Sequence, residues 1–264
     1  MEPTTSWPVR RFDQSAWESL QDAVISEGYV RLFLNGKLLS GFLCLPCDLE
    51  ALALGFLLTE GVVSPSGQLP EVRIDPQAAE VHVRAVVDAE AAVRPEQWRT
   101  SSGGFYCTSP TGDWSGLSGF GRLDTEVRFS PGAIADAVNA VQENASLFRA
   151  TGGTHAAALA SADGRLLLLC EDVGRYNAFD KVVGSAVRQR IGLQDKAIVT
   201  TGRVPLEIAA KAIRTSIPLV VSMSAPTSCA LALADRFGVT VVGFARGTRM
   251  NVYTHARRVS EDAR

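Results

Sequence analysis

The stretch from Thr151 to Gly184, TGGTHAAALASADGRLLLLCEDVGRYNAFDKVVG, decides the fold. A Gly-Gly pair and His155 precede one apolar run, and a second run, Leu166–Cys170, leads directly into a crowd of polar residues. Polar groups at the end of a buried strand are costly unless they pair or bind something, and ligands of open α/β sheets sit at that position. We therefore expect His155 and five further residues to shape a ligand pocket: Asp172, Arg175, Asn177, Asp180 and Lys181.

A purely structural alternative exists for the same residues. Asp172 would cap a helix that follows the strand, and Arg175 would pair with a neighbouring carboxylate. The pocket is favoured because the glycine pair Gly152-Gly153, His155 and the carboxamide of Asn177 all fall at one place.

The rest of this half alternates strictly between strands and helices. A helix start at Ser130-Pro131 is followed by a hairpin of strands His155–Ser161 and Leu166–Cys170 and by a helix over Asn177–Arg190. Strand–helix–strand spacing then predicts a parallel sheet with right-handed crossovers. Its expected strands are Lys196–Thr201, Ile217–Met223 and Val239–Ala245, with helices over Pro205–Thr215 and Pro226–Phe237.

Two short segments would then lie at the carboxyl ends of parallel strands. One is Thr201-Gly202-Arg203, and the other is Phe244-Ala245-Arg246-Gly247-Thr248-Arg249. Arginine forks suit phosphates, and glycine lets backbone N–H groups approach a ligand. Together the segments favour anion binding, although each arginine could instead pair with a helix end or a carboxylate.

The first half of the chain predicts a smaller α+β unit. Asn35-Gly36 between apolar runs is the strongest short signal for a β-hairpin. A helix from Asp48 to Gly61 and strands over 72–74 and 81–87 follow, and Arg94–Phe120 is so rich in Gly, Ser and Thr that we expect an exposed loop. We place an N-terminal α+β domain at 1–125 and an α/β domain at 126–264.

Composition excludes several classes of function. The 264 residues carry a formal net charge of −2, so no basic excess favours nucleic acid or anionic lipid as a partner. No signal-like start and no apolar stretch long enough to span a bilayer are present. We therefore expect a cytoplasmic protein that binds neither nucleic acid nor membrane.

The five cysteines are too few for a disulfide scaffold. Cys44 and Cys47 form a CxxC pair, which could be a redox couple, half a zinc site or, for Cys44, a buried core thiol. Cys107 lies in the Gly-rich loop. A thiol that passes a group from one partner to another must be exposed and mobile, and such a loop would provide both. The alternative is a loop cysteine without a function. Cys170 and Cys229 are expected in the core.

Zinc-deaminase chemistry is absent from the sequence. Those enzymes place a catalytic glutamate two residues after a ligating histidine and add a PCxxC ligand pair. Here Ala157 follows His155 at that spacing and no such pair follows. We expect no metal ligands and no zinc.

Several long motifs in one order resemble the formate dehydrogenase accessory sulfurtransferase family (FdhD), over about residues 28 to 258. They are LNGKLLSGFLCLPCDLEALALGFLLTEGVV, TGGTHAAAL, CEDVGRYNAFDKVVG, TTGRVPLEIAAKA, SAPTSCALALA and VGFARGTRMNVYT. The resemblance implies a cytidine-deaminase-like three-layer domain without zinc, a smaller N-terminal domain and a homodimer. It also implies sulfur transfer from a cysteine desulfurase, through a cysteine persulfide, to the bis-guanine-dinucleotide molybdenum cofactor that formate dehydrogenase needs.

The family's cofactor-binding segment falls on Phe244–Arg249. Its loop motif usually carries two cysteines, whereas this chain has Gly103 and Tyr106 at those positions and Cys107 one position beyond. Tyr176 also replaces the family's histidine in EDVGRYN. Cys107 is the expected persulfide carrier, and the chain is a sulfurtransferase if Cys107 has this role. The alternative is a cofactor-binding chaperone that has lost the relay.

Overall fold

The structure is a computed structural model of the 264-residue chain, and it describes residues 2–64, 69–87, 117 and 119–261. Cys107 and most of the predicted loop over 94–120 lie outside these residues. Among the described residues, no helix is both long and apolar enough to cross a membrane.

A six-stranded sheet forms the centre of the larger part, in the order β12-β11-β10-β9-β7-β8. The predicted parallel arrangement is confirmed for β9, β10 and β11, whereas β7, β8 and β12 run antiparallel to their neighbours. The strands are β7 (His155–Ala160), β8 (Leu166–Asp172), β9 (Ala197–Thr200), β10 (Leu219–Ser222), β11 (Thr240–Arg246) and β12 (Arg249–Val252).

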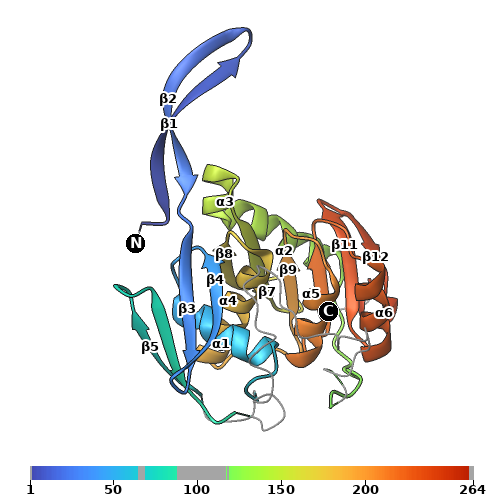
Figure 1. Cartoon of the computed structure of the whole chain (residues 1–264). Helices are drawn as coiled ribbons and strands as arrows, with labels where there is room; N and C mark the ends of the chain where they lie inside the picture. The colour runs from blue at the N-terminus through green and yellow to red at the C-terminus, as the bar shows by residue number, and fades with distance from the viewer. Residues whose placement is uncertain (1, 65–68, 88–116, 118, 262–264) are drawn as a thin grey trace.

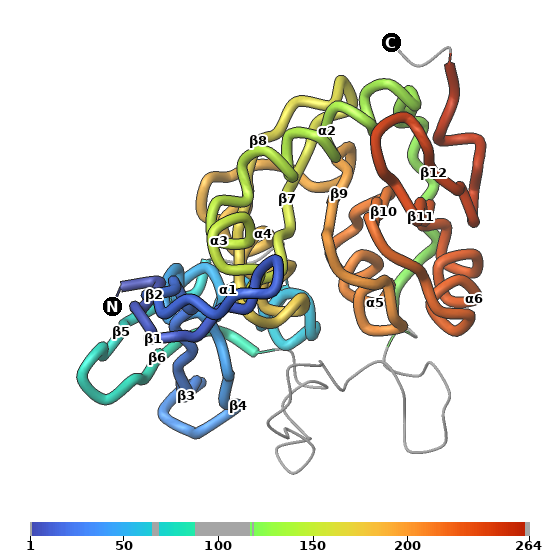
Figure 2. The backbone as a smooth tube through the Cα atoms, turned by 90° about the horizontal axis from the view of Figure 1, so that it is seen from above, coloured from blue at the N-terminus to red at the C-terminus, as the bar shows by residue number. Residues whose placement is uncertain are grey.

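Helices cover both faces of this sheet and make three layers (Figure 2). Alternate strand residues point to opposite faces, so Ala157, Ile198 and Val220 join one apolar cluster while Val199 and Val221 join another. The first cluster contains α4 (Arg175–Arg188), α5 (Leu206–Arg214) and α6 (Ser228–Phe237), and the second contains α2 (Pro131–Asn144). The short helices are α3 (Ser146–Thr151) and η4 (Ala256–Arg258).

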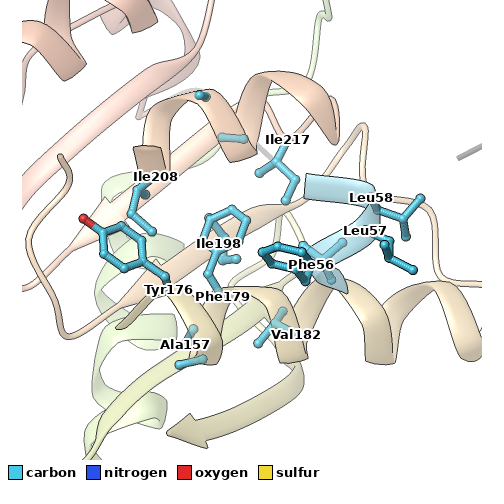
Figure 3. Packing of buried hydrophobic residues seen from close by; sticks show 14 of the residues in the cluster. Phe56, Leu57, Leu58, Ala157, Tyr176, Phe179, Val182, Ile198, Ile208 and Ile217 are labelled. Carbon is cyan, nitrogen blue, oxygen red and sulfur yellow. The ribbon is translucent and has the colours of Figure 1, made fainter. Parts of the chain in front are cut away.

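The N-terminal half contributes a second sheet and one buried helix. The sheet has the order β4-β3-β6-β5, with strands β3 (Gly28–Leu34), β4 (Lys37–Cys44), β5 (Glu71–Asp75) and β6 (Glu80–Arg84). Asn35 and Gly36 form the predicted hairpin turn, both with positive φ. Helix α1 (Leu49–Thr59) is apolar on nearly every side, as expected of a helix inside a core. Figure 3 shows its Phe56 beside Phe179 and Val182 of α4.

Two glycines allow α1 and α4 to pack backbone against backbone. A Cβ atom on Gly55 would lie 1.7 Å from the Asp180 carbonyl oxygen, and one on Gly184 would lie 1.9 Å from that of Ala51. The resulting apolar cluster runs from Val30 to Val241 and so crosses the predicted boundary between residues 125 and 126. The two-domain division stays a prediction.

The first strands form an arm that the sequence analysis did not predict. β1 (Thr4–Asp13) and β2 (Ala16–Ile25) pair only with each other among the described strands, and they stand out from the body (Figure 1). Gln14 and Ser15 turn the chain with φ values of 44° and 81°. Positive φ at both positions is the geometry of a type I′ turn, for which Asn-Gly is the usual signal.

Candidate functional site

Five strand ends meet at one edge of the central sheet. His155 at the start of β7 pairs with Asp172 at the end of β8. Thr200 at the end of β9 pairs with Ala157 and with Ser222. The two arginine-bearing segments thus lie at the same edge of the sheet as His155 and Asp172. We call this region the strand-end edge, and it comprises residues 152–155, 172–175, 201–203, 223–227 and 244–249.

Hydrogen bonds lock the turn after β9 to the turn after β10. The Gly202 N–H donates to Thr200 Oγ1 over 3.1 Å, and Ser222 Oγ donates to the Gly202 carbonyl over 2.7 Å. The Ser224 N–H in turn donates to Ser222 Oγ over 2.9 Å. These bonds fix the backbone beside Arg203, whose side chain is exposed.

Gly202 lies where a larger residue has no room. A Cβ atom there would be 2.9 Å from Arg175 Cβ and 3.5 Å from His155 Nδ1. The glycine therefore lets α4, β7 and β9 approach one another at the strand-end edge. Close packing thus explains why residue 202 is a glycine. The sequence analysis had explained the same glycine by the approach of a ligand to its backbone.

The end of β11 is irregular, and the irregularity exposes an aromatic ring. The register between β11 and β12 shifts between Gly243 and Arg246, and Phe244 has φ 52° with 39% of its surface exposed. Positive φ is costly for a bulky residue, and such strain concentrates at functional sites. The Phe244 N–H is held by the Ser224 carbonyl at 3.0 Å.

The remaining residues of 244–249 divide by exposure. Arg246, Gly247, Thr248 and Arg249 are exposed, and Gly247 has φ 55°. Arg246 Nε donates to the Met223 carbonyl over 3.4 Å. Ala245 is only 1% exposed, so its side chain belongs to the core and its backbone alone can meet a ligand.

The strand-end edge is electropositive. Helices α4, α5 and α6 each begin just after β8, β9 and β10 end, so their N-termini point to it. A helix N-terminus carries partial positive charge and free N–H donors. Four arginines lie there as well: Arg175, Arg203, Arg246 and Arg249. This donor set suits an anion with several oxygens, such as a phosphate diester.

Arg175 is oriented by an aromatic neighbour rather than by a carboxylate. Its guanidinium lies 4.4 Å from the Tyr176 ring centroid, and Nη2 donates to the Tyr176 hydroxyl over 2.9 Å. That hydroxyl donates to Glu207 Oε2 over 3.4 Å. Burial, and then the Glu207 charge, raise the pKa of Tyr176, so the phenol keeps its proton. The Arg175 Nε is buried and has no hydrogen-bond partner among the described residues.

His155 is held uncharged beside Arg175. Its Nδ1 lies 3.4 Å from Thr201 Oγ1. Burial, followed by the Arg175 charge, lowers the pKa of His155. The imidazole is therefore neutral near pH 7 and can both donate and accept a hydrogen bond.

Asp172, Asn177 and Lys181 lie beneath the edge and are buried. Asp172 Oδ2 is 2.7 Å from Lys181 Nζ and accepts the Leu45 N–H at 3.1 Å. Lys181 also donates to the Leu45 carbonyl over 3.0 Å, and Asn177 Nδ2 donates to the Leu43 carbonyl over 2.9 Å. The three side chains thus hold the end of β4 against α4 by hydrogen bonds to the backbone of Leu43 and Leu45.

Asp180 belongs to a separate buried ion network. Its Oδ1 accepts from Lys211 Nζ at 2.9 Å and from Thr59 Oγ1 at 2.7 Å, and Lys211 also bonds Glu60 Oε1 at 2.7 Å. Burial raises the pKa of Asp180 to about 6. Of the five polar residues expected in the pocket, only Arg175 is therefore partly exposed, and the other four are buried supports of the fold.

The cysteines differ in access. Cys44 is fully buried, and burial raises its pKa to about 12, which excludes Cys44 and Cys47 as an accessible redox pair. Cys170 is buried as expected, with a pKa raised by burial to about 11. The expectation that Cys229 is a core residue is wrong, because it is exposed in the first turn of α6. No three His, Cys, Asp or Glu side chains in the described ranges gather as metal ligands.

Fold and edge together define an α/β protein with a cluster of arginines and helix N-termini at the carboxyl ends of its parallel strands. The chain belongs to the FdhD/NarQ family, whose model matches residues 25–260. It is 36% identical to the sulfur carrier protein FdhD of Wolinella succinogenes, over 94% of this chain and 86% of that one. It is 34% identical to the sulfur carrier protein FdhD of Shouchella clausii, over 97% and 96% of the two chains.

A solved structure has the same fold. A protein of Desulfotalea psychrophila, described as a putative formate dehydrogenase accessory protein, superimposes with a TM-score of 0.82 at 26% identity. The match covers 98% of this chain and all of that one.

Sequence reasoning missed the residues that organise the edge. Glu207 and Ser222 contact residues of the edge through their side chains, and Ser224 does so through its backbone N–H and carbonyl. One signal was available for two of them: Ser222 and Ser224 follow an apolar strand directly, as polar residues do at strand ends.

Proposed function

We propose that this chain is a sulfur carrier that serves a formate dehydrogenase, and that its strand-end edge binds the bis-guanine-dinucleotide molybdenum cofactor as cargo. The names of its relatives support the first part. The observation that carries the second part is the donor set of the edge, where four arginines and three helix N-termini meet beside backbone that Gly247 leaves open.

The chemistry of the edge fits such a cargo. Arg203, Arg246 and Arg249 would hold phosphate oxygens, and the backbone at Gly247 would approach them closely. The exposed Phe244 ring offers a face on which a guanine can stack. Neutral His155 would hydrogen-bond a ligand oxygen or nitrogen. When bound, the cofactor supplies the metal centre that receives sulfur.

Cys107 would carry the sulfur. Its thiolate attacks the outer sulfur of a persulfide on a cysteine desulfurase, a new S–S bond forms on Cys107, and the donor cysteine leaves as a thiolate. A lowered thiol pKa would favour this step. Cys107 lies outside the described residues, so this role rests on the family resemblance and on the burial of Cys44 and Cys170.

Mass spectrometry of the intact protein tests the carrier. The protein is incubated with a cysteine desulfurase and cysteine, as wild type, Cys107→Ala and Cys229→Ala. We expect added sulfur on wild type and on Cys229→Ala, and none on Cys107→Ala. Sulfur that persists on Cys107→Ala would assign the role to another thiol.

A second candidate function is a cofactor-binding chaperone without a sulfur relay. The observation that favours it is that the four arginine side chains of the edge can hold phosphates without the help of a thiol. It predicts that Cys107→Ala still supports formate dehydrogenase maturation, whereas Arg246→Ala does not. Loss of maturation in both variants would favour the relay.

Calorimetry with GDP as a probe tests the edge itself. Removing the exposed Arg246 should weaken binding by about tenfold or more, since a hydrogen bond to a charged group is worth about 1.5–3 kcal/mol. Lys37→Ala is the matched control, because Lys37 is an exposed cation at the far end of the β3–β4 hairpin. Equal losses in both variants would show only a general effect of charge.

Finer points of the same proposal stay predictions. They are the cytidine-deaminase-like relationship of the three-layer part, the absence of zinc, the cytoplasmic location and the desulfurase and homodimer partners.

A further inference from the structure

Arg175 at the strand-end edge has a carboxylate close by with which it does not pair. The carboxylate belongs to Glu207 in the first turn of α5, and both side chains are partly exposed. Among the described residues, the guanidinium of Arg175 forms no salt bridge with an acidic side chain. Opposite charges attract at short range even near a protein surface. Some feature of the fold must therefore keep the two groups apart.

The hydroxyl of Tyr176 is the feature that separates them. It accepts from Arg175 Nη2 at 2.9 Å and donates to Glu207 Oε2 over 3.4 Å. A phenol can do both, because it carries one donor and free acceptor lone pairs. The Tyr176 ring also supports the guanidinium, with the Arg175 Cζ atom 4.4 Å from its centroid, and lies near Ile208 of α5 (Figure 3). One side chain thus satisfies both charged groups without letting them meet.

Arg175 is not placed to stabilise the fold. Its Nε is buried and has no hydrogen-bond partner among the described residues. Leaving such a donor unpaired is costly, so an unpaired donor in a folded protein calls for an explanation. The charge of Arg175 also reaches His155, where burial and then this charge lower the pKa of the imidazole. An anion bound beside both side chains would supply the missing negative charge.

We propose that Tyr176 is a positioning residue, whose hydroxyl holds Arg175 away from Glu207 and so keeps the guanidinium free to bind a phosphate beside His155. The inference rests on the proposed function, because the phosphate is that of the cofactor cargo. It adds a second phosphate subsite, on the α4 side of the edge, to the one that Arg246 supplies at the end of β11. The bis-guanine-dinucleotide cofactor carries two diphosphate groups, which two arginine subsites can hold.

The substitution Tyr176→Phe separates the hydroxyl from the ring. Phenylalanine keeps the aromatic face beside Arg175 but offers no hydrogen bond, so both charged groups lose their shared partner. A direct salt bridge between Arg175 and Glu207 then satisfies both of them. That salt bridge would occupy the guanidinium and offset its charge, so the substitution should act against anion binding and not only against stability.

Calorimetry with GDP as the probe measures the effect on binding. We expect Tyr176→Phe to weaken GDP binding by about tenfold or more, since a hydrogen bond to a charged group is lost. Adding Glu207→Gln should restore binding, because the neutral amide cannot form an ion pair with Arg175. If Tyr176 only supported the fold, a second substitution at its hydrogen-bond partner would give no recovery. Recovery in the double variant is therefore specific to the proposed role.

NMR titration of His155 without any ligand is the second readout. The Arg175 charge helps to lower the pKa of this histidine, after burial. In Tyr176→Phe a paired Glu207 would offset that charge, so we expect the pKa of His155 to rise toward its ordinary value. In the double variant the pKa should fall again. The other two histidines, on β6 and just before η4, are the internal reference.

Tyr29→Phe is the matched control for the loss of a tyrosine hydroxyl. Tyr29 and its cross-strand partner Leu43 are exposed, whereas their neighbours Val30 and Phe42 are buried. Tyr29 therefore lies on the outer face of the N-terminal sheet. We expect this variant to match wild type in both readouts.

Three results would overturn the proposal. They are wild-type GDP affinity in Tyr176→Phe, weak binding that Glu207→Gln does not restore, and an unchanged titration of His155 in Tyr176→Phe. A wild type that does not bind GDP would instead contradict the proposed function. The titration of His155 needs no ligand, so it would still decide whether Tyr176 separates the two charges.

Discussion

Burial separates the thiols of this chain into reactive and unreactive groups. Burial raises the pKa of Cys44 to about 12 and that of Cys170 to about 11, whereas Cys229 is exposed. The thiolate is the form that reacts with alkylating agents. We expect iodoacetamide at pH 8 to label Cys229 of the native protein at least about tenfold faster than Cys44 or Cys170, because the two buried thiols are shielded from the reagent and stay protonated at this pH.

Peptide mass spectrometry after timed quenching measures the labelling. The same reaction in denaturant is the control, in which all three cysteines should label at similar rates. Native labelling of Cys44 as fast as that of Cys229 would contradict the buried position of Cys44.

At the same scale, the sequence indicates which residue types gather but not how deep they lie. The cluster of polar residues that follows Cys170 correctly predicted the end of a strand. Asp172 and Lys181, however, are satisfied by the backbone of Leu45, 127 and 136 residues away. Asp180 is satisfied by Thr59. Local spacing contains no information about such distant partners, so buried supports and exposed ligand groups look alike in the sequence.

At the scale of elements, the crossing of α1 and α4 depends on Gly184. A Cβ atom there would lie 1.9 Å from the Ala51 carbonyl oxygen and 2.8 Å from the Gly55 nitrogen. Both are backbone atoms, so the helices must separate. We expect Gly184→Ala to lower the free energy of unfolding by about 1–3 kcal/mol or more, as measured by urea denaturation.

Gly132→Ala is a matched control for that substitution. Gly132 is also helical, but the nearest atom to its added Cβ is Ser130 Oγ at 3.8 Å. Because alanine loses less backbone entropy than glycine, this variant should be neutral or more stable, by up to about 1 kcal/mol. Equal destabilisation by both substitutions would mean that the close helix contact is not the cause.

Elements were predictable where their signals are local and strong. Asn35-Gly36 indicated the β3–β4 hairpin, and the alternation after residue 196 indicated the parallel strands. The arm was missed because its turn uses Gln14 and Ser15, which carry no such signal although their φ values are positive too. β12 was missed because Arg249 was assigned to the ligand segment alone, whereas Arg249–Val252 also pairs with β11.

At the scale of the whole molecule, one buried ion network joins the N-terminal helix to the larger part. Lys211 on α5 bonds Asp180 on α4 and Glu60 at the end of α1, and Arg214 Nη1 lies 3.6 Å from Glu60 Oε2. Removing one partner of a buried ion pair leaves a charge without compensation, which costs about 3–5 kcal/mol. The network therefore couples the three helices and makes stability depend on pH.

The sign of that dependence follows from the pKa of Asp180, which burial raises from 3.8 to about 6. Between these values the folded protein binds more protons than the unfolded chain, so the contribution of Asp180 to the free energy of unfolding falls as the pH rises through this window. The loss is at most about 3 kcal/mol. Lys211 adds no slope there: although burial opposes it, the charges of Asp180 and Glu60 raise its pKa further above 10.5.

Comparison with Asp180→Asn isolates this contribution. The variant should be less stable than wild type, and the difference between them should shrink as the pH rises from about 4 to about 6, in urea denaturation at several pH values. His155, whose pKa is lowered, adds the opposite slope to both proteins and cancels in the difference. A difference that instead grows with pH would mean that Lys211 holds the pKa of Asp180 below 3.8, and that the ion pair prevails over burial at this junction.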